Sequence, residues 1–579
     1  MPSLLGGRPL HRVNVTLPDK PKFENEQIPP RSIVITQDVE TRAPWRDTMT
    51  LHPAPTLLSH LLTEAEIPVP RGAEEVTVSG IATDSRRVSA GDLFIAIDGL
   101  HTDARAHVPE AIRRGAIAVV CEGAEELPDT GDVPLVTVPD ARVAASFLYD
   151  AWYGHPAREL RLVAVTGTNG KTTVSSLLRA ILRQAGVPCG LVGTVGCYSV
   201  VGNEPVGGGE GMTTPEPAEL YPLLARMAAE APADSPHPPT VVMEVTSHAL
   251  RQGRVAPLTF ELGIFTNLTP EHMDFHGTME DYYTAKRSLF EVCRVAVINA
   301  DDRYGRRLLS EPLPIQHYHI CHADGAGGLL SDRICPAGDG GCTRIYAEQV
   351  KLLGEDGVSF KLSSPDARLR LRVPIPGRFT VMNALEAASA ALALGASPAA
   401  VRDAPTHFGG VPGRMERVSL PDTDVPFSVF IDFAHTPDAL ENLLRSVHDF
   451  RRKDRRIVLV FGCGGDRDPS KRKVMARIAS RMADFLVITS DNSRSEEPDR
   501  IIGDILAGVD KESEFAVVPD RADAIRYAIR HARAGDIILL AGKGHETYEI
   551  DRRGKHPFCE KDIAVEAART FHAVHTDGR

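Results

Sequence analysis

The hydrophobic pattern of this chain alternates between short apolar runs and longer amphipathic segments. The runs at 162–165, 457–461 and 537–541 are bounded by polar or Gly-containing turns, as is typical of strands buried in a parallel sheet. Between such runs, apolar residues recur at helical spacing, for example from 174 to 181. This alternation of strands and helices predicts an α/β protein built on parallel sheets.

The same pattern predicts three domains after an N-terminal extension. Residues 1–50 are rich in Pro and charged residues without sustained periodicity, so we expect a disordered extension. We expect a small α/β domain at 51–158, a central domain at 159–411, and a C-terminal domain with an open, mostly parallel sheet at 412–579. The Gly-rich stretch 321–345 is typical of a surface loop of the central domain.

Composition excludes some classes of protein. The 579 residues carry a net charge of −12, which argues against a nucleic-acid-binding protein, because such proteins need a basic surface. The apolar runs stay below the roughly 18 residues needed to span a bilayer, so we expect no membrane insertion. The nine cysteines are scattered and never form CxxC, which indicates reduced thiols and a cytoplasmic location.

The motif with the clearest chemistry is TGTNGKTT, which follows the run at 162–165. Gly167 and Gly170 allow backbone N–H groups to converge on one point, and the following helix adds its positive N-terminal end. Lys171 can reach the β- and γ-phosphates of a nucleotide, and the Thr172 hydroxyl can bind Mg²⁺. We therefore assign ATP phosphates to the loop residues Gly167, Thr168, Asn169, Gly170, Lys171, Thr172 and Thr173.

This loop does not identify a family by itself. The strict P-loop pattern has Gly where this chain has Val165, so the motif is a shortened variant. The alternative interpretation is a Gly-rich turn between a strand and a helix that binds nothing.

Polar loops also follow several predicted strands in the C-terminal domain. They read AHTPDAL, GCGGDRD, SDNSRSEEP and GKGHETYE. Because the carboxyl ends of parallel strands meet at one edge of a sheet, these four loops predict a binding edge. In the first domain, residues 84–86 and 99–102 lie in similar positions, where ordinary turns are an equal alternative.

These segments, in this order, resemble the Mur ligase family of peptidoglycan synthesis. TGTNGKTT, MEVTSHAL, FTNLTPEHMDFHG with AKRSLF, DFAHTPDAL and FGCGGDRD are typical of the whole superfamily. DNSRSEEP and GKGHETYE are typical of the branch that adds a diamino acid. The resemblance covers residues 57–570 and implies a small N-terminal α/β UDP-binding domain, a central P-loop ATPase domain with a parallel sheet, and a C-terminal Rossmann-like domain.

The resemblance also implies a reaction. ATP would phosphorylate the side-chain carboxylate of D-glutamate in UDP-N-acetylmuramoyl-L-alanyl-D-glutamate, and the amine of 2,6-diaminopimelate would attack the acyl phosphate. The implied cofactors are ATP and Mg²⁺, and the implied partners are small-molecule substrates of a monomeric enzyme. The meso and LL isomers of diaminopimelate, and L-lysine, remain open as the acceptor.

Four residues carry the chemistry that the resemblance implies. A carboxylate that approaches a triphosphate is repelled, so cations must bridge the two. Lys171 would bind phosphate, and Glu244, at the end of the predicted strand 241–245, would hold Mg²⁺ with Thr172. Lys286 would be carbamylated and would ligate a second Mg²⁺ with His272. Without the resemblance, Glu244 would be a buried partner of an arginine, Lys286 a solvated helix residue and His272 part of a capped loop.

The resemblance assigns further substrate contacts residue by residue. Around the adenine and ribose of ATP it places Asn383, Asp432 and His435. Around the UDP-sugar peptide it places Thr83, Ser85, Leu100, His101, Thr102, Thr213, Thr214, Thr246, Gln252 and Arg254.

The remaining assignments form an amino-acid pocket. Its members are Arg472, Asp491, Asn492, Ser493, Arg494, Gly542 and Glu546. A guanidinium at Arg494 would hold the distal carboxylate of diaminopimelate bidentately, and Glu546 would pair with the distal ammonium. Ser493 replaces the proline that is usual in the family, which leaves the stereoisomer open. The alternative for Arg494 is a surface residue in a charged loop.

Two other functions agree less well with these motifs. A folylpolyglutamate synthase belongs to the same superfamily, but it lacks this kind of N-terminal domain and the DNSR and GKGHE pair. A nucleotide-dependent switch without catalysis would be favoured by loss of Lys171, Glu244 or Lys286, and all three are present.

Overall fold

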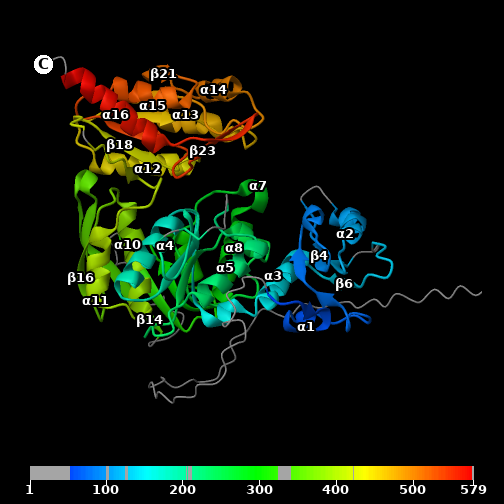
Figure 1. Cartoon of the computed structure of the whole chain (residues 1–579). Coiled ribbons are helices and arrows are strands. Elements are labelled where there is room, and N and C mark those ends of the chain that lie inside the picture. Colours follow the sequence, from blue (N-terminus) through cyan, green and yellow to red (C-terminus); the bar gives the residue numbers. More distant parts are fainter. Residues whose placement is uncertain are drawn as a thin grey trace, which may run out of the picture.

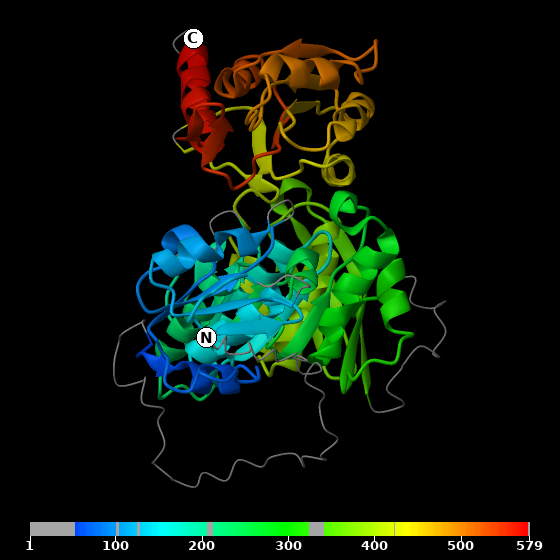
Figure 2. The ribbon, with the colours of Figure 1, turned by 90° about the vertical axis from the view of Figure 1, so that its right-hand side faces the viewer.

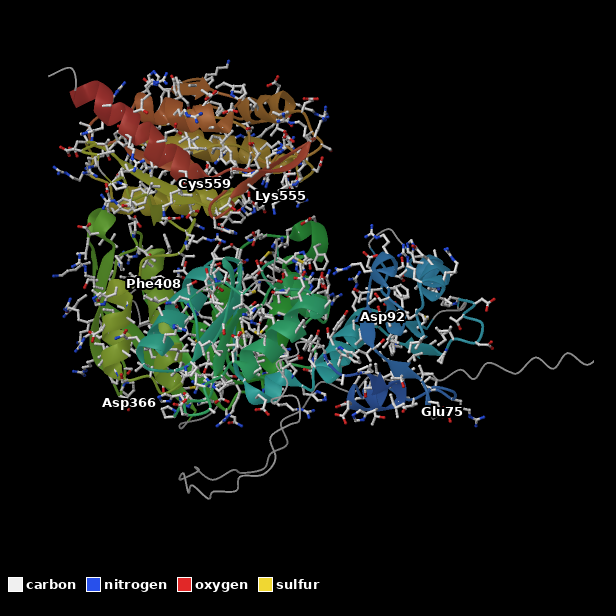
Figure 3. The ribbon with its side chains drawn as sticks, in the orientation of Figure 1. Glu75, Asp92, Asp366, Phe408, Lys555 and Cys559 are labelled. Carbon is white, nitrogen blue, oxygen red and sulfur yellow. The ribbon has the colours of Figure 1, made fainter. Side chains whose placement is uncertain are left out.

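Three α/β units make up the folded chain (Figure 1). The computed structural model describes residues 53–99, 103–123, 128–203, 205–206, 212–323, 341–421 and 423–576. The N-terminal unit lies to one side of the central unit, and the C-terminal unit lies above the central one (Figures 1 and 2). Asp92, Phe408 and Cys559 mark the N-terminal, central and C-terminal units in Figure 3.

The N-terminal unit is a four-stranded parallel sheet with helices. The strands, in sheet order, are β3 (Gly80–Ala82), β4 (Asp92–Ala96), β5 (Ala118–Glu122) and β6 (Leu135–Val138). The helices are α1 (Leu58–Glu64), α2 (Val108–Arg113) and α3 (Ala141–Trp152). A short antiparallel pair, β1 (Thr56–Leu57) and β2 (Thr77–Val78), precedes the sheet. Helix α3 begins where the Asp140 carboxylate accepts from two backbone N–H groups, and it carries the chain into the central unit.

The central unit contains a ten-stranded sheet in the order β16-β15-β14-β13-β12-β11-β7-β10-β8-β9. The strands are β7 (Arg161–Thr166), β8 (Cys189–Gly193), β9 (Gly196–Tyr198), β10 (Thr240–Glu244), β11 (Phe260–Phe265), β12 (Cys293–Asn299), β13 (His317–His322), β14 (Cys342–Leu352), β15 (Val358–Ser363) and β16 (Arg368–Val373). All neighbours from β14 to β8 pair in parallel, and the pairs β14–β15, β15–β16 and β8–β9 are antiparallel.

Helices cover both faces of the central sheet. They are α4 (Lys171–Gln184), α5 (Pro217–Ala229), α6 (Ser247–Arg251), α7 (Met273–His276), α8 (Met279–Arg287), α9 (Arg303–Leu308), α10 (Phe379–Ala393) and α11 (Pro398–Asp403). Val174, Leu178 and Ile181 of α4 are buried against the sheet, as the helical spacing predicts. Tyr221 of α5 and Tyr282 of α8 are buried in a second cluster.

The C-terminal unit contains a six-stranded sheet in the order β17-β18-β22-β19-β20-β21. The strands are β17 (Glu416–Arg417), β18 (Ser428–Asp432), β19 (Ile457–Phe461), β20 (Phe485–Ile488), β21 (Phe515–Val517) and β22 (Ile537–Ala541), and only β17 pairs antiparallel among them. The helices are α12 (Pro437–Phe450), α13 (Ser470–Met482), α14 (Pro498–Leu506), α15 (Arg521–Arg530) and α16 (Glu560–Thr576). A hairpin of β23 (Tyr548–Asp551) and β24 (Gly554–Pro557) lies outside the sheet.

The central and C-terminal units meet at the linker around Gly413. Its φ is +67°, and a Cβ there would lie 2.1 Å from the His545 backbone nitrogen, so only glycine fits. Glu355, between β14 and β15, forms an ion pair with Arg417 at 3.1 Å and a second ion pair with Arg455. The Ser428 hydroxyl donates to the same Glu355 carboxylate at 3.0 Å. Three groups of the C-terminal unit therefore bind one carboxylate of the central unit.

The α/β fold class with parallel sheets is confirmed, while the exact domain boundaries stay a prediction. The loop expected at 321–345 is partly wrong, because its ends belong to β13 and β14. Residues 324–340, like the extension 1–50, lie outside the described residues. Among the helices that the structure describes, none is long and apolar enough to cross a membrane.

Candidate active site

The phosphate loop joins β7 to α4 in the way the motif predicts. Gly170 has a φ of +87°, and a Cβ there would lie 2.6 Å from the Asn383 side-chain oxygen. The glycine therefore permits both the left-handed turn and the close approach of helix α10. Helix α4 begins at the next residue, so its free N–H groups face the loop.

Two lysines converge on one carbonyl group of this loop. The Lys171 ammonium donates to the carbonyls of Gly167 at 3.0 Å and Thr168 at 2.8 Å. Lys286, which is 1% exposed on α8, donates to the same Gly167 carbonyl at 2.9 Å. Burial lowers the pKa of Lys286 well below its ordinary value, and the neighbouring Lys171 charge lowers it further. Burial also lowers the pKa of Lys171.

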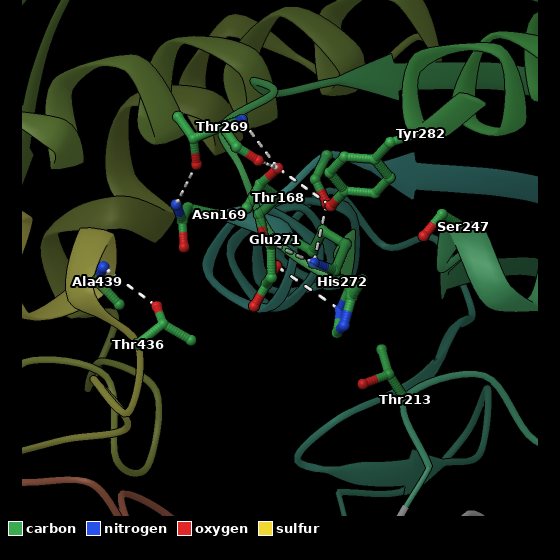
Figure 4. Close-up of polar contacts among 12 residues, drawn as sticks. Thr168, Asn169, Thr213, Ser247, Thr269, Glu271, His272, Tyr282, Thr436 and Ala439 are labelled. Carbon is green, nitrogen blue, oxygen red and sulfur yellow. Dashed lines mark hydrogen bonds and ion pairs between the residues drawn. The ribbon is translucent and has the colours of Figure 1, made fainter. Parts of the chain in front are cut away.

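The segment after β11 supports the loop from the other side (Figure 4). The Asn267 side chain accepts from the Asn169 N–H at 2.9 Å and donates to the Asn169 carbonyl at 3.1 Å. The Thr168 hydroxyl accepts from the Thr269 N–H at 3.0 Å and lies 3.1 Å from the Tyr282 hydroxyl. The segment after β11 therefore supports the loop through hydrogen bonds between neutral groups.

Glu244 lies fully buried at the carboxyl end of β10. Its carboxylate accepts from the Thr172 hydroxyl at 3.0 Å, the Thr194 hydroxyl at 2.9 Å and the Thr194 N–H at 3.0 Å. These partners are neutral oxygen and nitrogen groups rather than the arginine of the alternative interpretation. Glu244 and Thr172, predicted to share a role, are therefore in direct contact.

His272 lies at the start of α7 with a φ of +56°. Its ring contacts His248 edge-on, with 4.7 Å between ring centroids. Its Nε2 lies 3.7 Å from an oxygen of Glu271, and Figure 4 shows these two residues side by side. His248 in turn stacks on Phe275 at 4.1 Å. Across the described part of the chain, no group of three His, Cys, Asp or Glu residues is already arranged around a metal position.

A cavity of about 480 Å³ opens between the phosphate loop and the C-terminal unit. Asn383 and Asp432 line it together with Asn169, Gly170 and Thr173. Asp432 accepts from the N–H groups of Met415 at 2.7 Å and Ala434 at 2.9 Å, and burial raises its pKa. His435 follows Ala434, a lining residue, and its Nδ1 lies 2.9 Å from the Phe433 carbonyl oxygen.

The C-terminal unit contacts the phosphate loop directly through Asp438, in the first turn of α12. One oxygen of its carboxylate accepts from the Asn169 side chain at 3.2 Å and from the Thr269 hydroxyl at 2.9 Å. Figure 4 shows the start of α12, at Thr436 and Ala439, opposite Asn169. The cavity is thus closed on one side by an element of another unit.

The residues assigned to the UDP-sugar peptide form two groups. Around the end of β10, the Thr214 hydroxyl donates to the Glu244 carbonyl at 2.9 Å, and the Thr246 hydroxyl accepts from the Ala249 N–H at 3.2 Å. Thr213 lies 3.0 Å from Thr194 between hydroxyl oxygens.

Arg254 completes that group. It donates to the Gln252 side chain at 2.7 Å and to the Thr214 carbonyl at 2.7 Å, and it forms an ion pair with Glu216 at 2.7 Å. The N-terminal unit carries the second group, in which Thr83 is exposed and Ser85 donates to Glu110 at 3.2 Å. Leu100, His101 and Thr102 lie outside the described residues.

Most of the predicted amino-acid pocket comes together after β20 and β22. The Asn492 side chain donates to Glu546 at 2.8 Å, and Asp491 accepts from the Asn492 N–H at 2.6 Å. Gly542 lies so close to Asp491 that a Cβ would be 2.9 Å from a carboxylate oxygen. Burial raises the pKa of Glu546.

The two arginines of the pocket differ in their surroundings. Arg494 donates to the carbonyls of Gly465 at 2.8 Å and Asn492 at 3.3 Å and is partly exposed. Arg472 is 1% exposed and forms ion pairs with Glu496 at 2.8 Å and Asp504 at 2.9 Å. Arg472 therefore holds the loop that carries Arg494, and Ser493 is buried within that loop.

Sequence reasoning missed four residues at this site. Thr194 binds Glu244, Arg414 lines the nucleotide cavity, Asp438 binds the phosphate loop, and Lys543 lies among the pocket carboxylates. Asp438 and Lys543 belong to the motifs AHTPDAL and GKGHETYE, so their position in strand-end loops was a usable signal.

Comparisons with known proteins agree with this arrangement. The chain matches the Mur ligase family catalytic domain at residues 77–151, the Mur ligase middle domain at 165–391, and the Mur ligase glutamate ligase domain at 413–544. With matches to all three parts and relatives that are 40% identical over most of its length, the chain belongs to the Mur ligase family.

The names of individual relatives specify one particular ligase of this family. The chain is 40% identical over 521 residues to the UDP-N-acetylmuramoyl-L-alanyl-D-glutamate–2,6-diaminopimelate ligase of Syntrophomonas wolfei subsp. wolfei, covering 88% of this chain and 99% of that one. It is 42% identical over 502 residues to the ligase of the same name from Gloeobacter violaceus, covering 86% and 95%. A solved structure of a ligase of this name matches with a TM-score of 0.60 and 28% identity, covering 90% of this chain and 99% of that one.

Proposed function

We propose that this chain is the ATP-dependent ligase that joins 2,6-diaminopimelate to UDP-N-acetylmuramoyl-L-alanyl-D-glutamate in peptidoglycan precursor synthesis. The identity with ligases of that name over most of the chain supports this substrate pair. In the reaction, the D-glutamate side-chain carboxylate takes the γ-phosphoryl group of ATP and ADP leaves. The amine of the acceptor then attacks the acyl carbon, phosphate leaves, and an amide bond remains. We propose that the enzyme acts as a cytoplasmic monomer.

The observation that carries the proposal is the position of the acceptor pocket. Asn492, Glu546 and Arg494 present an amide, a carboxylate and a guanidinium, respectively, within one pocket of the C-terminal unit. A group with an ammonium and a carboxylate, as at the distal end of diaminopimelate, complements that set. The same unit contacts the phosphate loop through Asp438, so the acceptor and the nucleotide bind to units that touch.

The residues of the phosphate loop supply nucleotide binding. The ammonium of Lys171 lies within the loop, from which a lysine side chain reaches the β- and γ-phosphates. Asn383 and Asp432 would contact the adenosine part in the adjoining cavity. Docking of the C-terminal unit would exclude water from the acyl phosphate, which water would otherwise hydrolyse.

The donor set around Glu244 fits Mg²⁺. It combines a fully buried carboxylate with the Thr172 hydroxyl, and such hard oxygen ligands are what Mg²⁺ prefers. When bound, Mg²⁺ supplies positive charge between the triphosphate and the approaching carboxylate. We propose that Glu244 and Thr172 hold one ion and that His272 and carbamylated Lys286 hold a second.

The surroundings of Lys286 support carbamylation. A lysine must be neutral to attack CO₂, and burial beside the Lys171 charge favours the neutral amine. Its nitrogen forms a bond to the carbon of CO₂ and loses a proton, which leaves a carbamate anion in place of a cation. The remaining N–H keeps a hydrogen to donate to the Gly167 carbonyl.

The direct test is product analysis by mass spectrometry. The enzyme is incubated with ATP, Mg²⁺, the UDP-dipeptide and an equal mixture of meso-diaminopimelate, LL-diaminopimelate and L-lysine. We expect one product, with the mass of the diaminopimelate adduct, and chromatography against standards identifies the isomer. The Lys171→Ala variant is the control for contaminating ligase. A dominant lysine adduct, or no adduct from wild type, would disprove the proposed acceptor or the proposed reaction.

A further inference from the structure

The amino-acid pocket contains a buried cation, Lys543, beside the residues assigned to the acceptor. Lys543 is 0% exposed and follows β22 in the GKGHETYE loop. Its ammonium lies 3.5 Å from a Glu546 oxygen and 3.6 Å from an Asp491 oxygen. It also donates to the Asn492 side-chain oxygen at 2.8 Å. Lys543 therefore contacts three of the residues that would surround the acceptor.

Lys543 fixes the direction of the Asn492 amide. The Asn492 side-chain oxygen accepts from both Lys543 and the Ile550 N–H, at 2.8 and 2.9 Å. With both donors on the oxygen, the amide nitrogen must point the other way, where it donates to Glu546 at 2.8 Å. One oxygen of Glu546 is thereby held in place, and the other is left for a ligand.

Lys543 also sets the net charge of the group that it forms with Asp491 and Glu546. Two carboxylates and one ammonium leave a single net negative charge, which matches a single ammonium on the acceptor. The nearby Arg521 forms a buried ion pair with Glu560 at 2.8 Å, and its positive charge also lowers the pKa of Asp491. Glu549 on β23 also interacts with the charges of Lys543 and Arg521.

We propose that Lys543 is a positioning residue that makes the pocket select acceptors with a distal ammonium. This inference rests on the proposed function, because it assumes that the acceptor's distal end lies at Glu546. Without Lys543, Asp491 still has the charge of Arg521 beside it, whereas Glu546 loses the cation that lies 3.5 Å from its carboxylate. Burial already raises the pKa of Glu546, so this loss favours its protonated form, which cannot pair with an ammonium.

The test compares two acceptors in one tube. One is diaminopimelate, and the other is 2-aminopimelate, which keeps the distal carboxylate and lacks the distal ammonium. The ratio of products from this competition gives the ratio of kcat/KM values and does not depend on how much of the enzyme is folded. The variants are Lys543→Met, which removes the charge and keeps the length, and Lys561→Met as a control. Lys561 is half exposed and pairs with Glu416, outside the pocket.

We expect Lys543→Met to reduce the preference for diaminopimelate at least tenfold, mainly through KM for diaminopimelate. Lys561→Met should leave the preference within about twofold of wild type. If Lys543 had a purely structural role, its loss would lower kcat/KM for both acceptors equally and leave their ratio unchanged. That result would overturn the proposal.

A double-mutant cycle on Lys543 and Glu546 provides a second measurement. In the double variant both charges of the pair are removed, so no carboxylate of the pair is left without its cation. Glu546→Gln alone should reduce the preference, and adding Lys543→Met to it should reduce the preference little further, because Lys543 acts through Glu546. Independent, additive effects would overturn the proposal. If wild type instead joins another diamino acid, the proposed acceptor is wrong, and the same comparison with that diamino acid and its analogue without the distal ammonium still tests Lys543.

Discussion

At the scale of single residues, the Gly167 carbonyl is where two cationic side chains meet. Lys171 and Lys286 both donate to it, at 3.0 and 2.9 Å. Two ammonium groups on one buried acceptor repel each other, and this repulsion adds to burial in lowering the pKa of Lys286. The proposed carbamate would replace this repulsion with attraction between an anion and Lys171.

We therefore predict that Lys286 is carbamylated in the active enzyme. Wild type supplied with ¹³C-bicarbonate should show a carbamate carbon signal in its NMR spectrum, and Lys286→Ala should not. Lys286→Ala should be nearly inactive and should regain part of its activity with short carboxylic acids, which replace the missing anion. Lys361→Ala, a surface lysine paired with Glu348, is the control. An active wild-type enzyme without the signal would contradict the prediction.

Arg494 is predicted to distinguish diaminopimelate from lysine. The two acceptors share the attacking amine, so discrimination must come from the distal carboxylate. A hydrogen bond to a charged group contributes about 1.5–3 kcal/mol. At about 1.4 kcal/mol per decade this is roughly a 10- to 100-fold fall in kcat/KM for diaminopimelate in Arg494→Ala.

The kcat/KM values for lysine in the same two enzymes show whether Arg494 binds the distal carboxylate or only supports the loop. Activity with lysine should be poor in wild type and should change little in Arg494→Ala. Arg467→Ala, an exposed arginine in a neighbouring loop, should affect neither acceptor. Because Arg494 also donates to loop carbonyls, an equal fall for both acceptors would mean that it only supports the loop.

At the scale of elements, the start of α12 is the part of the C-terminal unit that binds the phosphate loop. Asp438→Ala removes two hydrogen bonds between units, to Asn169 and Thr269. Such bonds to a charged acceptor contribute about 1.5 kcal/mol or more, so we predict a rise of roughly tenfold in KM for ATP. Asp454→Ala, an exposed aspartate of the same unit, is the control for the steady-state kinetics. A lower KM for ATP in Asp438→Ala would instead mean that the carboxylate repels the phosphates.

Elements with a strong periodic pattern could be predicted from the sequence. The strands β19 and β22 have the bounds of the apolar runs 457–461 and 537–541, because both are central and buried on two faces. The edge of the central sheet could not be predicted in the same way. Strands β13 and β14 pair in parallel at the ends of a Gly-rich stretch, and such pairing depends on distant partners rather than on local pattern.

The candidate site also contains residues that the sequence predicts and residues that it does not. Glu244 and Thr172 were expected together because a motif and a strand end both indicated them, and they are 3.0 Å apart. The strand-end loops indicate the region of Asp438 and Lys543, but the individual roles of the two residues depend on contacts between segments far apart in the chain. The ion pairs of Arg472 with Glu496 and Asp504 likewise depend on tertiary structure.

At the scale of the whole molecule, the phosphate loop and the acceptor pocket lie on different units. The attacking amine must approach the acyl carbon to about 3–3.5 Å, so we predict that the units close further on their ligands. Gly413, with its φ of +67°, and Glu355, bound by Arg417 and Ser428, lie where the two units join. These contacts are placed to act as the pivot of that closure.

We predict that the radius of gyration in solution falls when the UDP-dipeptide and a non-hydrolysable ATP analogue are both present. Small-angle scattering measures this directly, and each ligand alone is the control. Scattering curves that coincide with and without the two ligands would show that the units do not close.

In the proposed reaction, this chain activates the D-glutamate carboxylate as an acyl phosphate for attack by diaminopimelate. The most direct measurement uses UDP-dipeptide with ¹⁸O in both oxygens of that carboxylate, in a complete reaction with ATP, Mg²⁺ and diaminopimelate. The account predicts that one ¹⁸O atom appears in the released phosphate and that the other remains in the new amide carbonyl. Unlabelled phosphate formed together with the amide product would contradict it.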